Sequence, residues 1–307
     1  MSTPDILISE VGPRDGLQNT KIFMPTEAKK RWISALAAAG LREIEVCSFV
    51  NPKLIPQFAD AAEIVAHALT IPDIAVVTLV PNLKGAARAA EAGAHKVSLP
   101  ISASEAHSKS NVRKTIDEQV EELERIVALR DASTLKFEVN GGISTAFGCT
   151  IQGEVPQKDV LRLVERLVAA GADTVSIADT VGYANPKQVR EVFAAAKKIA
   201  GKKLDAAHFH NTRGLGLANC MAAIEVGITA LDSSMAGLGG CPYAPGASGN
   251  VITEDLVFML ESMGLRTGVD FEKLLEARRV LEAALPGAEF HGHLAKAGLP
   301  KGFKEAA

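Results

Sequence analysis

The stretch VAAGADTVSI at residues 168–177 contains the pattern from which the fold follows. Alanine-rich helical residues end at Gly171, and a short run of β-branched and apolar residues comes directly after it. Glycine suits a helix C-terminus because it adopts a left-handed conformation without a Cβ clash. The run that follows is typical of a strand buried on both faces, as in a parallel sheet. The pattern therefore predicts a helix that leads into a parallel strand.

The same pattern recurs along the chain, at residues 36–46, 89–99 and 223–233. Strand-like runs number eight in all, at residues 6–11, 42–47, 74–79, 96–99, 135–139, 174–178, 204–208 and 230–234. Amphipathic helical patterns fill most of the gaps, for example at residues 26–39, 116–129 and 157–170. Eight alternating βα units in 307 residues predict an α/β fold, a TIM (β/α)8 barrel. Alternation alone also allows a doubly wound open sheet.

Composition sets the domain organisation and excludes several classes of partner. No low-complexity linker divides the chain, so we expect one domain over 1–307, with 270–307 as a C-terminal helical extension on the barrel.

Lys and Arg number 33 against 36 Asp and Glu, which gives no general attraction to nucleic acid or to an anionic membrane. The longest uncharged stretch, 233–253, is too rich in Gly, Pro and Ser for a membrane helix. Four widely spaced cysteines and the absence of a signal-like N-terminus predict a reduced, cytoplasmic protein.

Functional groups of a barrel lie on the loops after the strands. The first predicted strand is followed by GPRDGLQN at residues 12–19, where Arg14 places a cation beside Asp15, a possible metal ligand. Pro, Asp and Gly also form plain turns, so this segment alone leaves both interpretations open. At the end of the seventh strand, His208 and His210 share one face, with Phe209 on the other. Two imidazoles on one face suit a metal, although hydrogen-bonded core histidines would show the same pattern.

A glycine-rich segment, GLGGCPYAPGASGN at residues 237–250, follows the eighth predicted strand. So much glycine indicates either mobility with close approach to a ligand or a flexible connection. Cys241 within it is better placed to react than a buried thiol. A dinucleotide-binding fingerprint is not supported, because the third glycine is missing. A second His pair, His291 and His293, lies outside the predicted strands and is expected in the tail.

Barrel closure brings distant segments together, because strand one lies beside strand eight and strand eight beside strand seven. We therefore expect a mixed carboxylate, imidazole and amide site at one mouth, made of Asp15, His208, His210 and Asn250. Such a nitrogen and oxygen set favours Mg²⁺ or Mn²⁺, with Zn²⁺ or Co²⁺ as possible substitutes. Glu45 and Asp179, at the ends of strands two and six, add either acidic site groups or structural ion-pair partners.

Several motifs together resemble the 3-hydroxy-3-methylglutaryl-CoA lyase family. They are EVGPRDGLQN at 10–19, IEVCSFV at 44–50, VPNLKG at 80–85, the glycine-rich segment at 237–250 and EDLVFMLE at 254–261. The likeness runs from about residue 6 to residue 275, and the wider group includes isopropylmalate and homocitrate synthases. The resemblance implies a metal-dependent lyase that cleaves a 3-hydroxy-3-methylacyl-CoA by a retro-Claisen reaction. The substrate it implies is 3-hydroxy-3-methylglutaryl-CoA, with acetyl-CoA and acetoacetate as products.

The resemblance also implies roles for single residues and a homodimer as in the family. The metal ligands it implies are Asp15, His208, His210 and Asn250. The resemblance implies that Arg14 stabilises enolate charge and that Cys241, on a lid formed by the glycine-rich segment, is the acid. It implies His208 or an acidic neighbour as the base, and Glu45 and Asp179 as acidic site residues. Positions around the substrate or the CoA moiety are Gln18, Lys21 and Ser48.

The chain departs from the lyase pattern just after the second histidine. The lyases usually continue with Asp-Thr-Tyr-Gly, whereas this chain has Asn211, Thr212, Arg213 and Gly214. An inward Arg213 would clamp a substrate carboxylate or phosphate, and an outward one would be solvated. The asparagine is reminiscent of the condensing synthases, so a 2-oxo-acid synthase remains open as an alternative. A lyase for a related ester such as citramalyl-CoA and a non-catalytic binding protein with the same fold also remain open.

Overall fold

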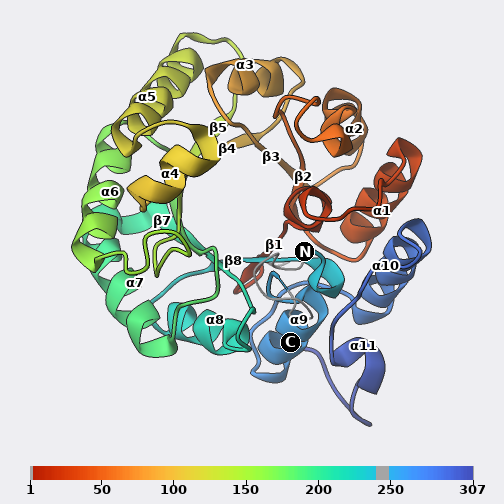
Figure 1. Cartoon of the computed structure of the whole chain (residues 1–307). Helices are drawn as coiled ribbons and strands as arrows, with labels where there is room; N and C mark the ends of the chain where they lie inside the picture. Colours follow the sequence, from red (N-terminus) through yellow and green to blue (C-terminus); the bar gives the residue numbers. More distant parts are fainter. Residues whose placement is uncertain (1–2, 240–248, 307) are drawn as a thin grey trace.

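The computed structural model describes residues 3–239 and 249–306, and its strands close into one parallel barrel (Figure 1). The strands are β1 (Leu7–Glu10), β2 (Glu43–Ser48), β3 (Ala75–Leu79), β4 (Lys96–Ser102), β5 (Glu138–Ser144), β6 (Thr174–Asp179), β7 (Leu204–Phe209) and β8 (Ala230–Ser233). Each strand pairs with the next, and β8 pairs with β1 from Leu7 opposite Ala230 to Glu10 opposite Ser233. This last pairing excludes the open sheet and confirms the predicted TIM barrel.

Helices surround the barrel wall (Figure 1). Their bounds are α1 (Thr26–Ala38), α2 (Ala61–Ala68), α3 (Leu83–Glu91), α4 (Glu105–Val112), α5 (Ile116–Ala132), α6 (Gln157–Ala169), α7 (Pro186–Ala200), α8 (Gly216–Glu225), α9 (Thr253–Ser262), α10 (Phe271–Ala284) and α11 (Leu294–Ala297). The helices predicted at 26–39, 116–129 and 157–170 correspond to α1, α5 and α6. None of the helices in the described part of the chain is long and apolar enough to cross a membrane.

The predicted fifth strand at 135–139 is wrong in its placement, because β5 begins at Glu138 and runs through two glycines. A Cβ on Gly141 would lie 3.0 Å from Leu167 Cδ1, so the glycine lets α6 pack directly on the strand. Asn140 faces the barrel interior, where its Nδ2 donates to Ser98 Oγ (2.9 Å) and Ser176 Oγ (3.2 Å). Close packing outside and polar contacts inside hold a strand that has little β-propensity of its own.

The glycines of the recurring pattern have the conformation that the sequence predicts. Their φ angles are +99° at Gly40, +91° at Gly93, +89° at Gly171 and +88° at Gly227. All four lie at the end of a helix, directly before the connection to the next strand. The pattern therefore marks the change from helix to strand at each of these places.

Gly40→Ala is expected to lower the free energy of unfolding by about 3 kcal/mol, because it combines backbone strain with a clash. The new Cβ would lie 2.3 Å from the backbone oxygen of Gly268. Gly264→Ala is the matched control, since Gly264 also has a positive φ (+78°) but no atom within 4 Å of the added Cβ. Urea unfolding of both variants measures the difference. Equal losses would show that the contact with Gly268 is unimportant.

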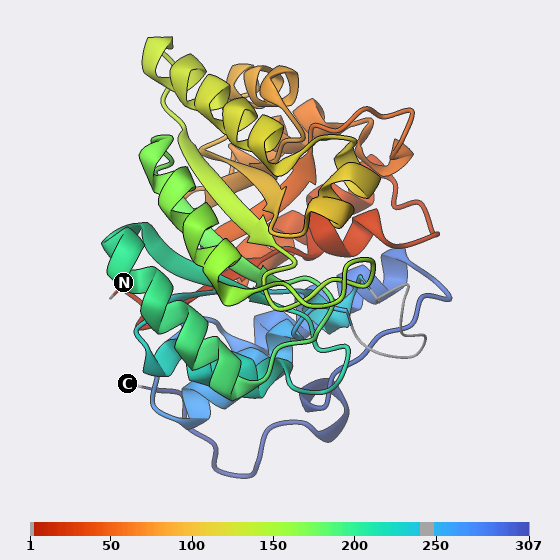
Figure 2. The ribbon, with the colours of Figure 1, turned by 60° about the vertical axis from the view of Figure 1, so that its left-hand side comes forward.

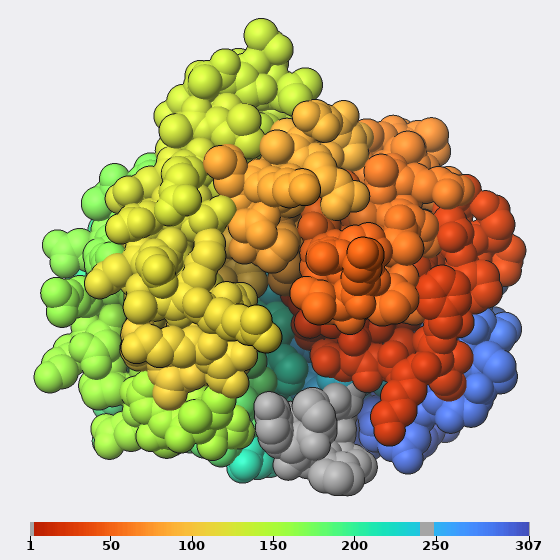
Figure 3. Space-filling view, turned by 45° about the horizontal axis from the view of Figure 1, so that its top comes forward, coloured from red at the N-terminus to blue at the C-terminus, as the bar shows by residue number. Residues whose placement is uncertain are grey.

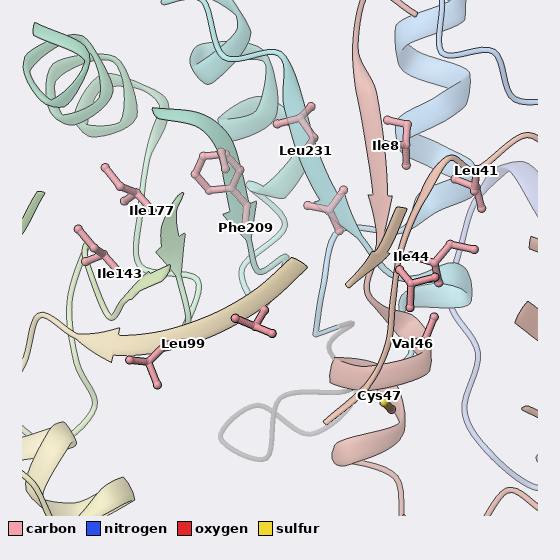
Figure 4. Packing of buried hydrophobic residues seen from close by; sticks show 14 of the residues in the cluster. Ile8, Leu41, Ile44, Val46, Cys47, Leu99, Ile143, Ile177, Phe209 and Leu231 are labelled. Carbon is pink, nitrogen blue, oxygen red and sulfur yellow. The ribbon is translucent and has the colours of Figure 1, made fainter. Parts of the chain in front are cut away.

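The apolar core lies between the barrel wall and the helices. Figure 4 shows side chains of this cluster, including Ile8, Leu99, Ile177 and Leu231, on the strands of the wall. The barrel interior is instead polar, with a small cavity of about 70 Å³. Its lining includes Arg14, Glu45, Asn140, Asp205 and Asp232. The usual apolar layers of a barrel interior are thus replaced by hydrogen-bonding and charged groups.

The segment after residue 270 packs beside one part of the barrel (Figures 1 and 2). α10 contacts α1 and α9, and α11 contacts α9. Arg278 on α10 donates from Nη1 to Glu254 Oε1 on α9, at 2.8 Å. His291 and His293 lie between α10 and α11, outside the barrel strands, where the backbone N–H of His293 donates to Asp255. The division into one barrel domain with a 270–307 extension stays a prediction.

Candidate active site

The loop after β1 places Arg14 and Asp15 over the barrel interior. Gly12–Gly16 forms a single wide helical turn, in which the carbonyl oxygen of Val11 accepts the backbone N–H of Arg14 (3.1 Å) and Asp15 (2.7 Å). Figure 3 shows a hollow between the yellow region of α4 and the red and orange loops near residues 20–60. Teal residues, near 200, are visible deep in the hollow.

A carboxylate and two imidazoles meet at this end of the barrel. Asp15, His208 and His210 each offer a ligand atom, and these atoms all lie within 4.8 Å of one another. Phe209 lies on the opposite side of β7, where its ring is 5.9 Å from that of Phe193 on α7. The predicted alternation of inward histidines and outward phenylalanine is therefore confirmed.

Asn250, the last residue of the glycine-rich segment, completes the cluster. Its backbone forms a β-bridge with His210, and its Nδ2 donates to Asp15 Oδ2 at 2.7 Å. Since the amide nitrogen is used by Asp15, the amide oxygen remains for another partner. Among the described residues, Asn250 Oδ1 and His210 Nδ1 are buried polar atoms without a hydrogen bond. Buried polar atoms are rarely left unpaired, so these two atoms and the mixed donor set fit a divalent cation.

Arg14 connects the cluster with a second carboxylate. Its Nη1 donates to Asp15 Oδ1 at 2.6 Å, and its Nε donates to Glu45 Oε2 at 2.5 Å. Burial would raise the pKa of Asp15, but the charge of Arg14 and the two histidines outweigh burial and hold that pKa below its usual range. Glu45 differs, because burial exceeds the effect of Arg14 and raises its pKa to about 7. The site thus holds one firmly ionised carboxylate and one that titrates near neutrality.

The two histidines also differ in their electrostatic surroundings. Burial and the neighbouring His208 lower the pKa of His210 to about 4, so its imidazole is neutral and able to bind a cation. For His208, burial opposes protonation, but the hydrogen bond and charge of Asp232 outweigh it and raise the pKa. The distance from His208 Nδ1 to Asp232 Oδ2 is 3.0 Å.

Asp232, which lies on β8, was not predicted from the sequence as a site residue. The sequence did contain a signal, because an acidic residue within an apolar strand run is unusual. Side chains alternate along a strand, so Asp232 faces inward if its neighbour Leu231 faces outward. Asp232 lines the interior cavity together with Arg14 and Glu45. The cluster at the mouth is therefore continuous with the polar interior of the barrel.

Asp179 is fully buried at the end of β6 and holds the loop that follows. Its two carboxylate oxygens accept the backbone N–H groups of Tyr183 (2.8 Å) and Ala184 (3.0 Å). Burial raises its pKa, while these hydrogen bonds and the charge of His208 act in the opposite direction. Asp179 is thus near His208, but its hydrogen bonds are to backbone. Its catalytic role stays a prediction.

The expected substrate positions lie in the connection after β1 and at the end of β2. Gln18 is half-buried and Lys21 is exposed in the connection between β1 and α1. Ser48 is buried at the end of β2, where its Oγ accepts the backbone N–H of Val50 at 3.3 Å. Cys241 lies outside the described residues.

Arg213 packs on the neighbouring loop. Its Nη1 donates to the carbonyl oxygens of Val181 (2.9 Å) and Gly182 (3.1 Å), and its guanidinium lies 4.5 Å from the centre of the Tyr183 ring. The residue as a whole is exposed. It therefore forms part of the rim of the mouth and holds the loop between β6 and α7.

A parallel eight-stranded barrel with a carboxylate, two imidazoles and an amide at its C-terminal mouth defines a class of divalent-metal barrel enzymes. The family model described as HMGL-like matches residues 5–281, and the chain belongs to this family. The resemblance seen in the sequence is thereby confirmed. The curated relatives of this chain are named hydroxymethylglutaryl-CoA lyases, which are carbon–carbon lyases, and enzymes of this family depend on a divalent metal.

Individual relatives are similar to this chain in sequence over most of their length. The hydroxymethylglutaryl-CoA lyase YngG of Bacillus subtilis is 43% identical over 277 residues, which is 90% of this chain and 92% of that protein. The mitochondrial human hydroxymethylglutaryl-CoA lyase is 41% identical over 280 residues, or 91% of this chain and 86% of the human one. The solved HMG-CoA lyase from Acinetobacter baumannii, a complex with coenzyme A and 3-methylmalate, is 41% identical with a TM-score of 0.90, covering 99% of both chains.

Proposed function

We propose that this chain cleaves 3-hydroxy-3-methylglutaryl-CoA to acetyl-CoA and acetoacetate. The observation that carries the proposal is Arg14, which is hydrogen-bonded to both Asp15 and Glu45 beside the Asp15, His208 and His210 cluster. In this proposal, the fixed cation of Arg14 stabilises the enolate charge that develops next to groups that suit a divalent ion. Relatives at 41–43% identity across about nine-tenths of the chain carry the name of this lyase.

The cation that we propose is Mg²⁺ or Mn²⁺, held by Asp15, His208, His210 and Asn250. When bound, such an ion supplies a Lewis acid that lowers the pKa of a coordinated hydroxyl. Asp15 contributes the anionic charge of the set, and Asn250 contributes the amide oxygen that lacks a partner.

Proton transfers and bond cleavage then follow from the chain's own residues. A base at the mouth, His208 or Glu45, accepts the proton of the substrate's tertiary hydroxyl. The hydroxyl oxygen becomes the new ketone of acetoacetate as the bond between C2 and C3 breaks. The electron pair moves onto the thioester as an enolate, which Arg14 stabilises. In this proposal, Cys241 gives a proton to the acetyl-CoA carbanion.

The remaining residues bind or orient the substrate in this proposal. The positions around the acyl-CoA are Gln18, Lys21 and Ser48. Arg213 forms part of the rim of the mouth, and Asp179 holds the loop after β6 against the site. The related structure in complex with coenzyme A supports an acyl-CoA as the ligand. A homodimer and a cytoplasmic location stay predictions, as does the absence of nucleic-acid and membrane partners.

A product assay tests the proposed function against the competing functions. Incubation of the purified chain with Mg²⁺ or Mn²⁺ and 3-hydroxy-3-methylglutaryl-CoA is expected to yield acetoacetate and acetyl-CoA in equal amounts. Free CoA from acetyl-CoA and a 2-oxo acid would instead identify a condensing synthase. Faster cleavage of citramalyl-CoA would identify a lyase with another substrate. Metal binding without turnover of any ester would indicate a binding protein.

Arg213→Tyr, which restores the usual lyase residue, is expected to change the ranking of acyl-CoA substrates by more than about tenfold, or about 1.4 kcal/mol. The reason is that a tyrosine hydroxyl has one donor hydrogen and cannot replace both hydrogen bonds of Arg213 to Val181 and Gly182, so the loop after β6 shifts at the rim. The measurement is kcat/KM for a series of 3-hydroxy-3-methylacyl-CoA esters.

The control for this substitution is Arg190→Tyr, because Arg190 pairs with Glu225 on the outer surface of the barrel. The control is expected to leave the ranking unchanged. If Arg213→Tyr changes kcat/KM for every ester by the same factor, Arg213 does not select the substrate.

A further inference from the structure

Asp232 and His208 form an in-register pair on neighbouring strands at the top of the polar barrel interior. The register of β7 and β8 places the two residues opposite each other, and Asp232 Oδ2 lies 3.0 Å from His208 Nδ1. Both side chains are largely buried, with exposed fractions of 24% for Asp232 and 13% for His208. The contact is therefore built into the barrel wall and does not depend on a flexible loop.

This contact has a consequence for the imidazole of His208. A carboxylate accepts hydrogen bonds, so the hydrogen of a neutral His208 ring is placed on Nδ1. Nε2 then carries the lone pair and is the ring atom left for a cation. His210 differs, because its Nδ1 has no hydrogen-bond partner among the described residues. One histidine of the cluster is thus fixed by a carboxylate, and the other has no such partner on Nδ1.

We propose that Asp232 is a positioning residue that fixes the ring orientation and the Nδ1–H tautomer of His208 for metal binding. The proposal rests on the metal site of the proposed function. Carboxylates that hold metal-binding histidines in this way typically change metal affinity about 10–100-fold when they are replaced. An asparagine in such a place can present its amide N–H₂ to the ring and favour the wrong tautomer.

A different role for Asp232 is to balance charge inside the barrel. Its charge acts on Arg14, whose pKa is raised chiefly by Glu45 and Asp15 against the effect of burial, and also on Glu45. If Asp232 acted only through its charge, the loss of another carboxylate in the interior would have the same effect as the loss of Asp232. Asp205 supplies the matched control, because it lines the same cavity but lies near the start of β7, at the other end of that strand from His208.

The experiment compares Asp232→Asn with Asp205→Asn in the full chain without substrate. Mn²⁺ binding is measured by electron paramagnetic resonance, and the tautomer of His208 in the metal-free protein by ¹⁵N NMR of the imidazole rings at a pH above the raised pKa of His208, where the ring is neutral. Asp232→Asn is expected to raise the Kd for Mn²⁺ about 10–100-fold and to lose the Nδ1–H tautomer of His208. Asp205→Asn is expected to leave both unchanged.

Three outcomes overturn the proposal. They are an unchanged Kd and tautomer in Asp232→Asn, equal effects in both variants, and an Nε2–H tautomer of His208 in the wild-type protein. The last of these needs no variant, so the proposal remains testable if Asp232→Asn does not fold. Failure of the proposed function is a separate result, because wild-type metal binding and a fixed His208 without turnover would refute only the lyase activity.

Discussion

Asp15→Asn is expected to lower kcat by about 10³-fold or more, because a bound cation supplies several kcal/mol of charge stabilisation. Asp15 is the carboxylate of the Asp15, His208 and His210 cluster, and it also accepts hydrogen bonds from Arg14 and Asn250. The amide has a similar volume, so the barrel is expected to remain folded while the site loses the carboxylate that we propose as a metal ligand. The measurements are kcat with saturating 3-hydroxy-3-methylglutaryl-CoA and the Kd for Mn²⁺.

Asp73→Asn is the control for this substitution. Asp73 is exposed in the connection before β3, and its φ of +61° is one that asparagine tolerates. The control is expected to keep wild-type turnover and metal affinity. Wild-type turnover after exhaustive chelation, with metal absent by elemental analysis, would refute the metal assignment at Asp15.

Arg14→Lys is expected to lower kcat by about 10²–10³-fold with a smaller change in KM, because in the proposed mechanism Arg14 stabilises charge that develops in the reaction. Arg14 uses two different nitrogens, Nη1 toward Asp15 and Nε toward Glu45. A lysine ammonium is a compact charge on a flexible stem and cannot reproduce this planar fork of donors. Steady-state kinetics with 3-hydroxy-3-methylglutaryl-CoA separates kcat from KM.

The matched control is Arg130→Lys, because Arg130 also bridges two carboxylates, those of Asp131 (2.8 Å) and Asp173 (2.5 Å). These residues lie at the end of α5 and before β6, at the opposite end of the strands from the metal cluster. The control is expected to affect stability and to leave kcat unchanged. If Arg14→Lys keeps the wild-type kcat, Arg14 takes no part in the chemistry.

The sequence alone determined the features that follow from local rules. The glycines at helix ends, such as Gly40 and Gly171, indicated the βα repeat because few other residues adopt a positive φ without strain. His208 and His210 were assigned to one face because side chains alternate along any strand. The convergence of Asp15 with both histidines followed from barrel closure once eight units were counted. The resemblance to the family then supplied the substrate class.

Only the tertiary structure decided the features that depend on contacts between distant segments. The place of β5 was set by the packing of α6 on Gly141 and by hydrogen bonds of Asn140 to Ser98 and Ser176. Arg213 turned to the carbonyl oxygens of the loop after β6, because those acceptors and the Tyr183 ring lie within its reach. The pairing of His208 with Asp232 required the register of β7 against β8. Local periodicity gives the face on which a side chain lies, whereas its partner depends on the packing of segments far apart in the chain.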